Sequence, residues 1–261
     1  MEWMGFVFTI FVGVVLGLMG AGGAILMVPI LVYLFHFSPI EATSYSLFVV
    51  GITAILGGIQ YFQNHQVNGK VVILFGLPGW IGVMFSRKLL LPQLPEQMFF
   101  FTKGQLVMVV FAVLMLMASL NMIRKKKNKH PQQGVHKNYF RILMQGFFVG
   151  MVTGFVGAGG GFLIVPALVL MIGLGMRVAV GTSLVIIAMN SLFGFLLEFE
   201  KWNQLQWKFL FTIVILSILG FVVGYALHKK ISEEKLKPAF GWFVLVTGVF
   251  VLLDQIRQWV V

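Results

Sequence analysis

The polar residues of this chain that are best placed to do chemistry are neutral. Ser46 and Ser183 lie 137 positions apart in two apolar segments, Thr182 precedes the second serine, and Asn190 is the most polar residue in the middle of a predicted helix. Hydroxyl and amide groups can donate hydrogen bonds to an oxyanion without a buried cation. We interpret these four residues as candidate binding groups for a small anionic substrate, with hydrogen bonding between membrane helices as their alternative role.

A glycine-rich stretch that ends in proline occurs twice in the chain. Residues 17–29 read GLMGAGGAILMVP, residues 154–166 read GFVGAGGGFLIVP, and eight of the thirteen positions are identical. Glycine tolerates non-helical dihedral angles, and proline lacks a backbone donor. We therefore predict that Pro29 and Pro166 act in helix breaking or gating. The glycines expected to contribute backbone to a substrate site are Gly20, Gly22, Gly23, Gly157, Gly159, Gly160 and Gly161.

The two glycine stretches favour a binding site over a packing surface. Small residues do let membrane helices approach closely, but such packing needs glycine at every fourth position and does not need adjacent glycines. Non-helical backbone at membrane depth is tolerated only where it is buried in protein or lines a cavity. Half-helices that start at Ala24 and Gly161 would direct free N–H groups towards each break, as at other anion sites.

Ionisable residues are missing from the centres of the predicted membrane spans. Five ionisable residues fall near the ends of spans: Arg87, Lys88, Glu198, His228 and Asp254. Glu41 stands at the start of a helix. Proton relays and cation carriers usually place such a group at depth. The sequence also contains no metal-ligand spacing and no pair of nucleophile and base within a span. It therefore predicts neutral recognition of an anion, without a metal, a cofactor or an enzymatic activity.

Composition places the chain in the membrane. Of its 261 residues, 59% are hydrophobic and only 10% are charged, and the mean hydropathy is +0.96. Soluble domains have about 25% charged residues. The net charge of +11 comes from Lys and Arg between apolar runs, where they meet lipid headgroups, so nucleic acid is not an expected partner. There is no cysteine, and the first apolar run has no signal-peptide pattern.

The apolar runs predict an all-α polytopic membrane protein with two homologous four-segment repeats and about eight transmembrane segments. The expected units are a first repeat at 1–123, a basic cytoplasmic linker at 124–138 and a second repeat at 139–261. The first segment of each repeat is too long for one crossing, because about 20 residues suffice, and is expected to break at its glycines. The predicted runs are 3–37, 41–62, 70–91, 103–123, 139–174, 177–197, 206–228 and 237–259.

The charge distribution bears on whether the repeats are parallel or inverted. If each broken run crosses the membrane once, Lys and Arg divide eleven to eight between the two sides. If each run enters and leaves on the same face, they divide thirteen to six. The positive-inside rule favours the second arrangement, with inverted repeats and both termini outside. Both arrangements place the basic segment 124–141 in the cytoplasm.

At these residues the sequence resembles the TauE/SafE family of sulfite exporter-type anion permeases. The resemblance rests on the two glycine stretches through Pro29 and Pro166, on the Ala-x-x-x-Ser and Ala-x-Gly-Thr-Ser segments that follow them, and on the basic linker. It implies a permease of a bacterial or archaeal inner membrane that moves sulfite, sulfonates or related organic anions. The first copy departs from the pattern, because Ala24 stands where the second has Gly161.

The sequence as a whole predicts a secondary transporter or exporter of small anions. Two alternatives from other classes stay open, an anion-conducting channel and a membrane scaffold subunit that transports nothing. The particular anion, the direction of transport and the coupling ion do not follow from these residues, and neither does the oligomeric state.

Overall fold

The computed structural model of the chain describes residues 2–95, 97–98, 101–123, 139–156, 161–199, 202, 205–228 and 233–260. The predicted linker 124–138 and the glycines Gly157, Gly159 and Gly160 lie outside the described residues. The described part of the chain is helical except for a two-residue antiparallel pair, β1 (Gln97–Met98) with β2 (Phe101–Thr102).

The first apolar run folds back on itself at its glycines. Helix α1 (Glu2–Met19) ends where Gly20 takes a positive φ of 66°, and a 3₁₀ turn (Gly20–Gly23) leads into α2 (Ala24–Tyr33). The returning chain brings the ring of Phe35 within 5.3 Å of the ring of Phe6 near the start of α1. Both ends of the run therefore lie together, and the predicted break at the glycines is confirmed.

Proline does not make this break. Pro29 lies inside α2, which continues to Tyr33, and Pro166 lies inside α9 (Gly161–Ala167). Membrane helices tolerate internal proline where neighbouring groups satisfy the freed backbone. The assignment of these prolines as helix breakers is corrected, because the helical course runs through both of them.

The rest of the first half consists of three long helical segments. Helix α3 (Pro39–Gln63) begins with a capping box in which the side chains of Ser38 and Glu41 accept from each other's backbone N–H, so Glu41 is a helix-start carboxylate as predicted. A second apolar rod joins α4 (Gly69–Val71), α5 (Leu77–Phe85) and α6 (Leu91–Gln93) through two π-helical turns, Val72–Gly76 and Ser86–Leu90. Helix α7 (Lys103–Ile123) follows.

The second half has the same order of long segments. Helix α8 (Tyr139–Val156) precedes α9, which extends through a π-helical turn (Leu168–Ile172). Then come α10 (Met176–Leu196), α11 (Trp207–His228) and α12 (Glu233–Val260). Among the described residues, five helices are long and apolar enough to cross a membrane, and α1, α2 and part of α7 are shorter apolar helices. The protein is thus a multi-pass membrane protein, while the figure of eight segments stays a prediction.

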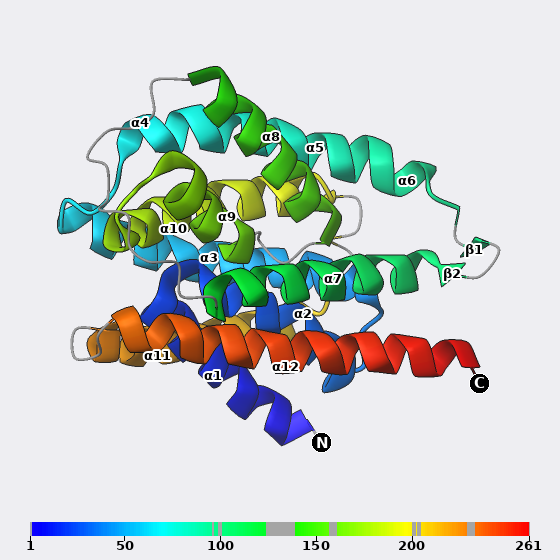
Figure 1. The fold of residues 1–261 in the computed structure, drawn as a ribbon. Coiled ribbons are helices and arrows are strands. Elements are labelled where there is room, and N and C mark those ends of the chain that lie inside the picture. The colour runs from blue at the N-terminus through cyan, green and yellow to red at the C-terminus, as the bar shows by residue number, and fades with distance from the viewer. Residues whose placement is uncertain are drawn as a thin grey trace.

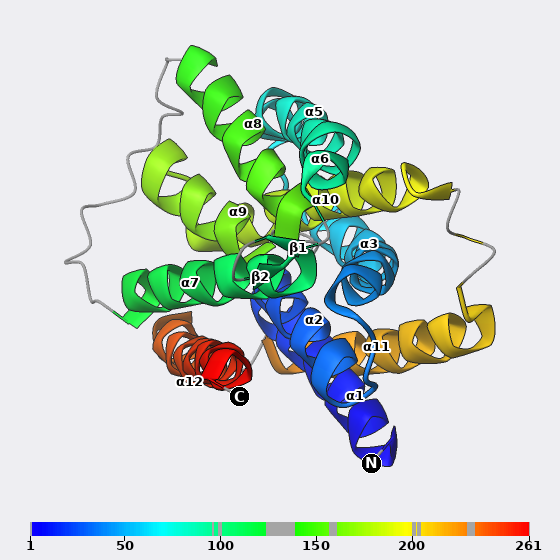
Figure 2. The same ribbon diagram turned by 90° about the vertical axis from the view of Figure 1, so that its right-hand side faces the viewer.

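The long helices pack in four principal pairs. Helix α1 packs on α11, α5 on α8, α3 on α10, and α7 on α12, and the last pair runs side by side at the front of Figure 1. In the view turned by 90°, α3 and α10 lie near the middle, with α5 and α8 towards the top and α1 and α11 towards the bottom (Figure 2). Each of the two sequence halves therefore contributes helices to every pair.

Glycine residues let the backbones of two of these pairs, α1–α11 and α5–α8, approach closely. An ideal Cβ on Gly13 would lie 2.1 Å from the carbonyl oxygen of Ser217, and one on Gly220 would lie 2.0 Å from that of Ile10. The same closeness recurs between α8 and α5, where a Cβ on Gly150 would lie 2.0 Å from the carbonyl oxygen of Gly79. These positions admit no side chain, which is the packing role of small residues in membranes.

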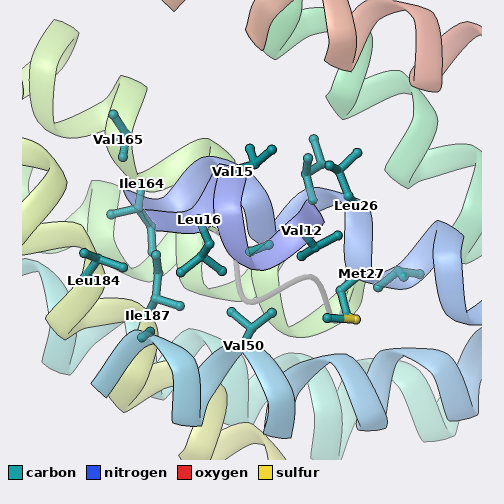
Figure 3. Close-up of a cluster of buried hydrophobic side chains, with 14 of the residues drawn as sticks. Val12, Val15, Leu16, Leu26, Met27, Val50, Ile164, Val165, Leu184 and Ile187 are labelled. Atoms are coloured by element: carbon teal, nitrogen blue, oxygen red, sulfur yellow. The ribbon is translucent and has the colours of Figure 1, made fainter. Parts of the chain in front are cut away.

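The centre of the molecule is an apolar core built around the first break. Side chains from α1, α2, α3, α9 and α10 converge there, including Leu16, Met27, Val50, Ile164 and Leu184 (Figure 3). All five are 1% exposed or less. The turn between α1 and α2 is therefore held in the protein interior, with Gly20 and Gly23 both buried.

Candidate functional site

The first glycine break packs against elements of the other half of the chain. Helix α9, which follows the second glycine stretch, contacts the Gly20–Gly23 turn. An ideal Cβ on Gly20 would lie 2.4 Å from Cγ1 of Val180 in α10. The two glycine-containing runs thus meet inside the protein, as the sequence predicts for a site shared between halves.

Thr182 and Ser183 lie at the same end of α10 as Val180, and both hydroxyls are engaged. Ser183 Oγ donates to the carbonyl of Val180 at 2.8 Å, and Thr182 Oγ1 accepts from the backbone N–H of Asn68 at 2.9 Å. The bond from Asn68 holds the loop between α3 and α4 against α10. Both contacts are structural, and the substrate-binding role of these two residues stays a proposal.

Ser46 is not brought together with Ser183. The neighbouring Leu47 packs at Gly194 near the end of α10, whereas Leu184 packs at Gly57, ten residues further along α3. With a rise of 1.5 Å per residue, the two serines are separated by roughly 15 Å along the helix pair. Ser46 is fully buried, and its Oγ has no hydrogen-bond partner within the described ranges.

Asn190 lies between these two levels, where α10 faces α5 and α8. An ideal Cβ on Gly79 would lie 3.0 Å from Nδ2 of Asn190 and 3.3 Å from the carbonyl oxygen of Gly146. Asn190 is 1% exposed, and neither Oδ1 nor Nδ2 has a partner among the residues that the structure describes. A buried amide without partners is unusual and calls for an explanation.

The glycines of the first stretch have different roles. Gly20 supplies the positive φ of the turn, and a Cβ on Gly23 would lie 2.5 Å from the backbone nitrogen of Leu16, so Gly23 closes the α1–α2 hairpin. Gly17 packs against α11. Packing, the alternative role considered for the stretch, therefore accounts for two of its glycines. Gly22 lies in the 3₁₀ turn, and Gly161 begins α9.

A charged cluster that the sequence analysis did not select lies at the tip of α8. Arg87 Nη1 is 2.5 Å from Glu198 Oε1, with side chains 2% and 12% exposed. Arg87 Nε donates to the carbonyl of Gly154 at 3.1 Å, and Ser44 Oγ donates to Glu198 Oε2. Two adjacent buried donors, Arg87 Nη2 and Ser86 Oγ, have no partner in the described part of the chain.

A small pocket reaches this cluster. It has a volume of about 40 Å³, and its polar wall is formed by Glu41, Ser44, Tyr45 and Glu198. The rings of Phe195 and Trp202 stack at 5.3 Å and form part of the apolar wall. A space of roughly 10–15 Å³ holds one water molecule, so the pocket admits a few waters or one small ion.

The positions of Arg87 and Glu198 explain why the sequence did not single them out. Each lies near the end of an apolar run, where a charged residue ordinarily reaches solvent. The π-helical turn Ser86–Leu90 and the fold of the α10–α11 connection instead bring them together in the interior. The available signal was the position of Arg87 within the apolar rod Gly69–Gln93, because a buried ionisable residue in a membrane helix indicates function.

Known proteins resemble the chain over nearly its whole length. A family model described as "Sulfite exporter TauE/SafE" matches residues 5–251. A "Probable membrane transporter protein" of Xylella fastidiosa is 29% identical over 257 residues, which cover 95% of this chain and 92% of that protein. The "Probable membrane transporter protein YdhB" of Bacillus subtilis is 24% identical over 92% of this chain and 96% of its own length.

The similarity extends to archaea. A probable membrane transporter protein of Methanocaldococcus jannaschii is 30% identical over 115 residues, which cover 42% of this chain and 43% of that protein. No solved structure gives a significant match. Because the family model spans nearly the whole chain and the relatives are described as membrane transporters, the chain belongs to the TauE/SafE sulfite exporter family of membrane transporters.

Proposed function

We propose that the protein is a secondary transporter that moves small anions, such as sulfite, sulfonates or related organic anions, across the cytoplasmic membrane of a bacterium or archaeon. The observation that carries the proposal is the contact between the Gly20–Gly23 turn and α9, the helix that follows the second glycine stretch. Discontinuous helices that meet at a repeat interface form the substrate sites of many transporters. The family description, a sulfite exporter, supports the class of substrate.

The helix pairing supports an architecture of two repeats, 1–123 and 139–261, joined by the linker 124–138, and the positive-inside rule favours the inverted arrangement of these repeats. If α8 corresponds to α1, and α11 to the α4–α6 rod, then the pairs α1–α11 and α5–α8 are equivalent. The pairs α3–α10 and α7–α12 are then each made of corresponding helices. A duplicated chain related by a pseudo-twofold axis produces this pattern.

The candidate site residues enter the proposal as two groups. Ser183, Thr182 and the Gly20 turn lie towards one end of the α3–α10 pair, and Ser46 lies towards the other. Asn190 lies between them with both amide atoms unpaired in the described structure. Gly157, Gly159 and Gly160 are proposed to line the second break.

Flux measurements on the purified protein in proteoliposomes test the proposal. A carrier gives uptake of labelled sulfite or methanesulfonate that saturates with concentration and is driven by an ion gradient, whereas a channel gives flux that follows the electrical gradient alone. A scaffold gives no flux and tolerates Gly22→Leu and Gly160→Leu in folding and assembly. Absence of flux for sulfite, methanesulfonate and acetate in folded protein would contradict the proposal.

A further inference from the structure

The contacts around Arg87 and Glu198 recur elsewhere in the molecule with different residues. Tyr61 precedes Glu198 by 137 positions, and Tyr225 follows Arg87 by 138. The rings of Tyr61 and Tyr225 contact each other with centroids 5.8 Å apart at 72°. The aromatic pair is therefore equivalent in position to the ion pair, and each pair joins the first half of the chain to the second.

The surrounding contacts match as well. Ser44, which bonds Glu198, has Gly181 as its counterpart at an offset of 137, and a Cβ on Gly181 would lie 2.8 Å from Cβ of Tyr61. Tyr45 OH accepts from the backbone N–H of Gln206 at 2.7 Å, just as Thr182 Oγ1 accepts from that of Asn68. The two environments are thus built alike except for the charges.

The tyrosine pair indicates that the fold does not require an ion pair at this position. At the equivalent contact the corresponding helices pack through two tyrosines, and replacing a buried ion pair by packed apolar groups is often neutral or stabilising. Burying a guanidinium is unfavourable unless all its donors are satisfied, yet Arg87 Nη2 has no partner among the described residues. The charges therefore need a role other than packing.

The geometry around Arg87 is that of a group held ready for an anion. A guanidinium binds carboxylates and other oxyanions through two parallel N–H···O bonds. Here Arg87 Nη1 pairs with Glu198, and Nε donates to the carbonyl of Gly154. Nη2 and Ser86 Oγ are buried donors without a partner in the described structure. Glu198 also forms part of the wall of the pocket, so the carboxylate lies between the pocket and Arg87.

We propose that Arg87 binds the transported oxyanion beside the end of α8, and that the Glu198 carboxylate is bound to Arg87 until the anion displaces it. This inference rests on the proposed anion transport and assigns its charged group to one of the two equivalent contacts between the halves. The ligand class is a small anion with two oxygens on one face, such as sulfite, a sulfonate or a carboxylate. When displaced, Glu198 keeps the hydrogen bond from Ser44.

Sulfite flux in proteoliposomes tests the assignment with charge-neutral variants. Glu198→Gln keeps the shape and removes the competing charge, so its half-saturating sulfite concentration should fall by about tenfold or more. The double variant Arg87→Gln/Glu198→Gln leaves no unpaired charge and should fold, while its sulfite flux falls to that of protein-free vesicles. Tyr225→Phe, at the position matching Arg87, is the control and should transport as the wild type does.

The outcomes distinguish the role of the ion pair from the proposed transport function. A double variant that transports sulfite like the wild type would show that the ion pair is structural, and weaker sulfite affinity in Glu198→Gln would show that Glu198 does not compete with the anion. Either result overturns the assignment while leaving anion transport intact. A folded wild-type protein that moves no tested anion overturns the proposed function itself.

Discussion

At the scale of single residues, the molecule divides its buried polar groups into those with local partners and those without. Thr53 Oγ1 donates to the carbonyl of Val49 and lies within hydrogen-bond distance of Ser217 Oγ. Asn190, 137 positions later, is equally buried but has no partner within the described ranges. Since an unpaired buried polar group is unfavourable, the contrast favours a role beyond packing for Asn190, which shares its lack of a partner in the described structure with Ser46.

We expect Asn190→Leu to reduce anion flux without weakening the fold. Leucine has a similar volume and removes two unpaired polar atoms, so stability should stay level or rise by about 1–3 kcal/mol. Flux should fall by roughly tenfold if the amide loses one hydrogen bond to the anion. Proteoliposome uptake and unfolding in mixed micelles measure the two quantities.

Thr53→Val is the matched control for this variant. Its hydroxyl is already bonded, so the loss should be about 0.5–1.5 kcal/mol of stability with unchanged flux. Wild-type flux in Asn190→Leu would assign Asn190 to packing alone.

The candidate site could be predicted from sequence only where neighbouring residues decide it. The clustered glycines are a local pattern, and they located the turn at Gly20. The Arg87–Glu198 pair joins residues 111 positions apart. No local pattern reports such a contact, because it depends on how the two halves pack.

At the scale of elements, composition predicted the helix boundaries, but it did not predict that the first run folds back as a hairpin. The run predicted at 103–123 coincides with α7. Whether the first run crosses the membrane or returns was left to charge counting, because glycine permits either course. What decides it is the contact of Gly23 with the backbone of Leu16.

The turn at Gly20 should be sensitive to alanine for two separable reasons. A left-handed conformation costs an L-residue about 1–2 kcal/mol. At Gly20 the new Cβ would also lie 2.4 Å from Val180 Cγ1, which adds roughly 1–3 kcal/mol of overpacking. Gly20→Ala should therefore lower the free energy of unfolding by more than the backbone term alone.

Gly173→Ala measures the cost of the left-handed backbone conformation without overpacking. Gly173 has a φ of 83° and nothing within 4 Å of its ideal Cβ, so the variant should lose only about 1–2 kcal/mol. A cycle that adds Val180→Ala to Gly20→Ala should recover part of the difference. Zero coupling between positions 20 and 180 would mean that α10 does not press on the turn in solution.

At the scale of the whole molecule, the hairpin of the first run bears on the proposed orientation of the two halves. The predicted inverted arrangement needs the first run to leave on the face where it enters, and the contact of Phe35 with Phe6 places both ends of that run together. If the second run returns in the same way, neither run contributes a net crossing, and the halves have the opposite orientations that we propose. The thirteen Lys and Arg on the linker side would face the cytoplasm.

Labelling with a membrane-impermeant thiol reagent tests this orientation directly, because the chain contains no cysteine of its own. Gln97→Cys and Gln63→Cys calibrate the experiment, since the inverted and the parallel arrangements both place position 97 outside and position 63 in the cytoplasm. Glu2→Cys distinguishes the two arrangements. In intact cells we expect it to react as Gln97→Cys does, because the run that starts at Glu2 returns to its own face. Reaction of Glu2→Cys only after lysis, together with Gln63→Cys and a cysteine in the linker, would require a first run that crosses the membrane and repeats that run parallel.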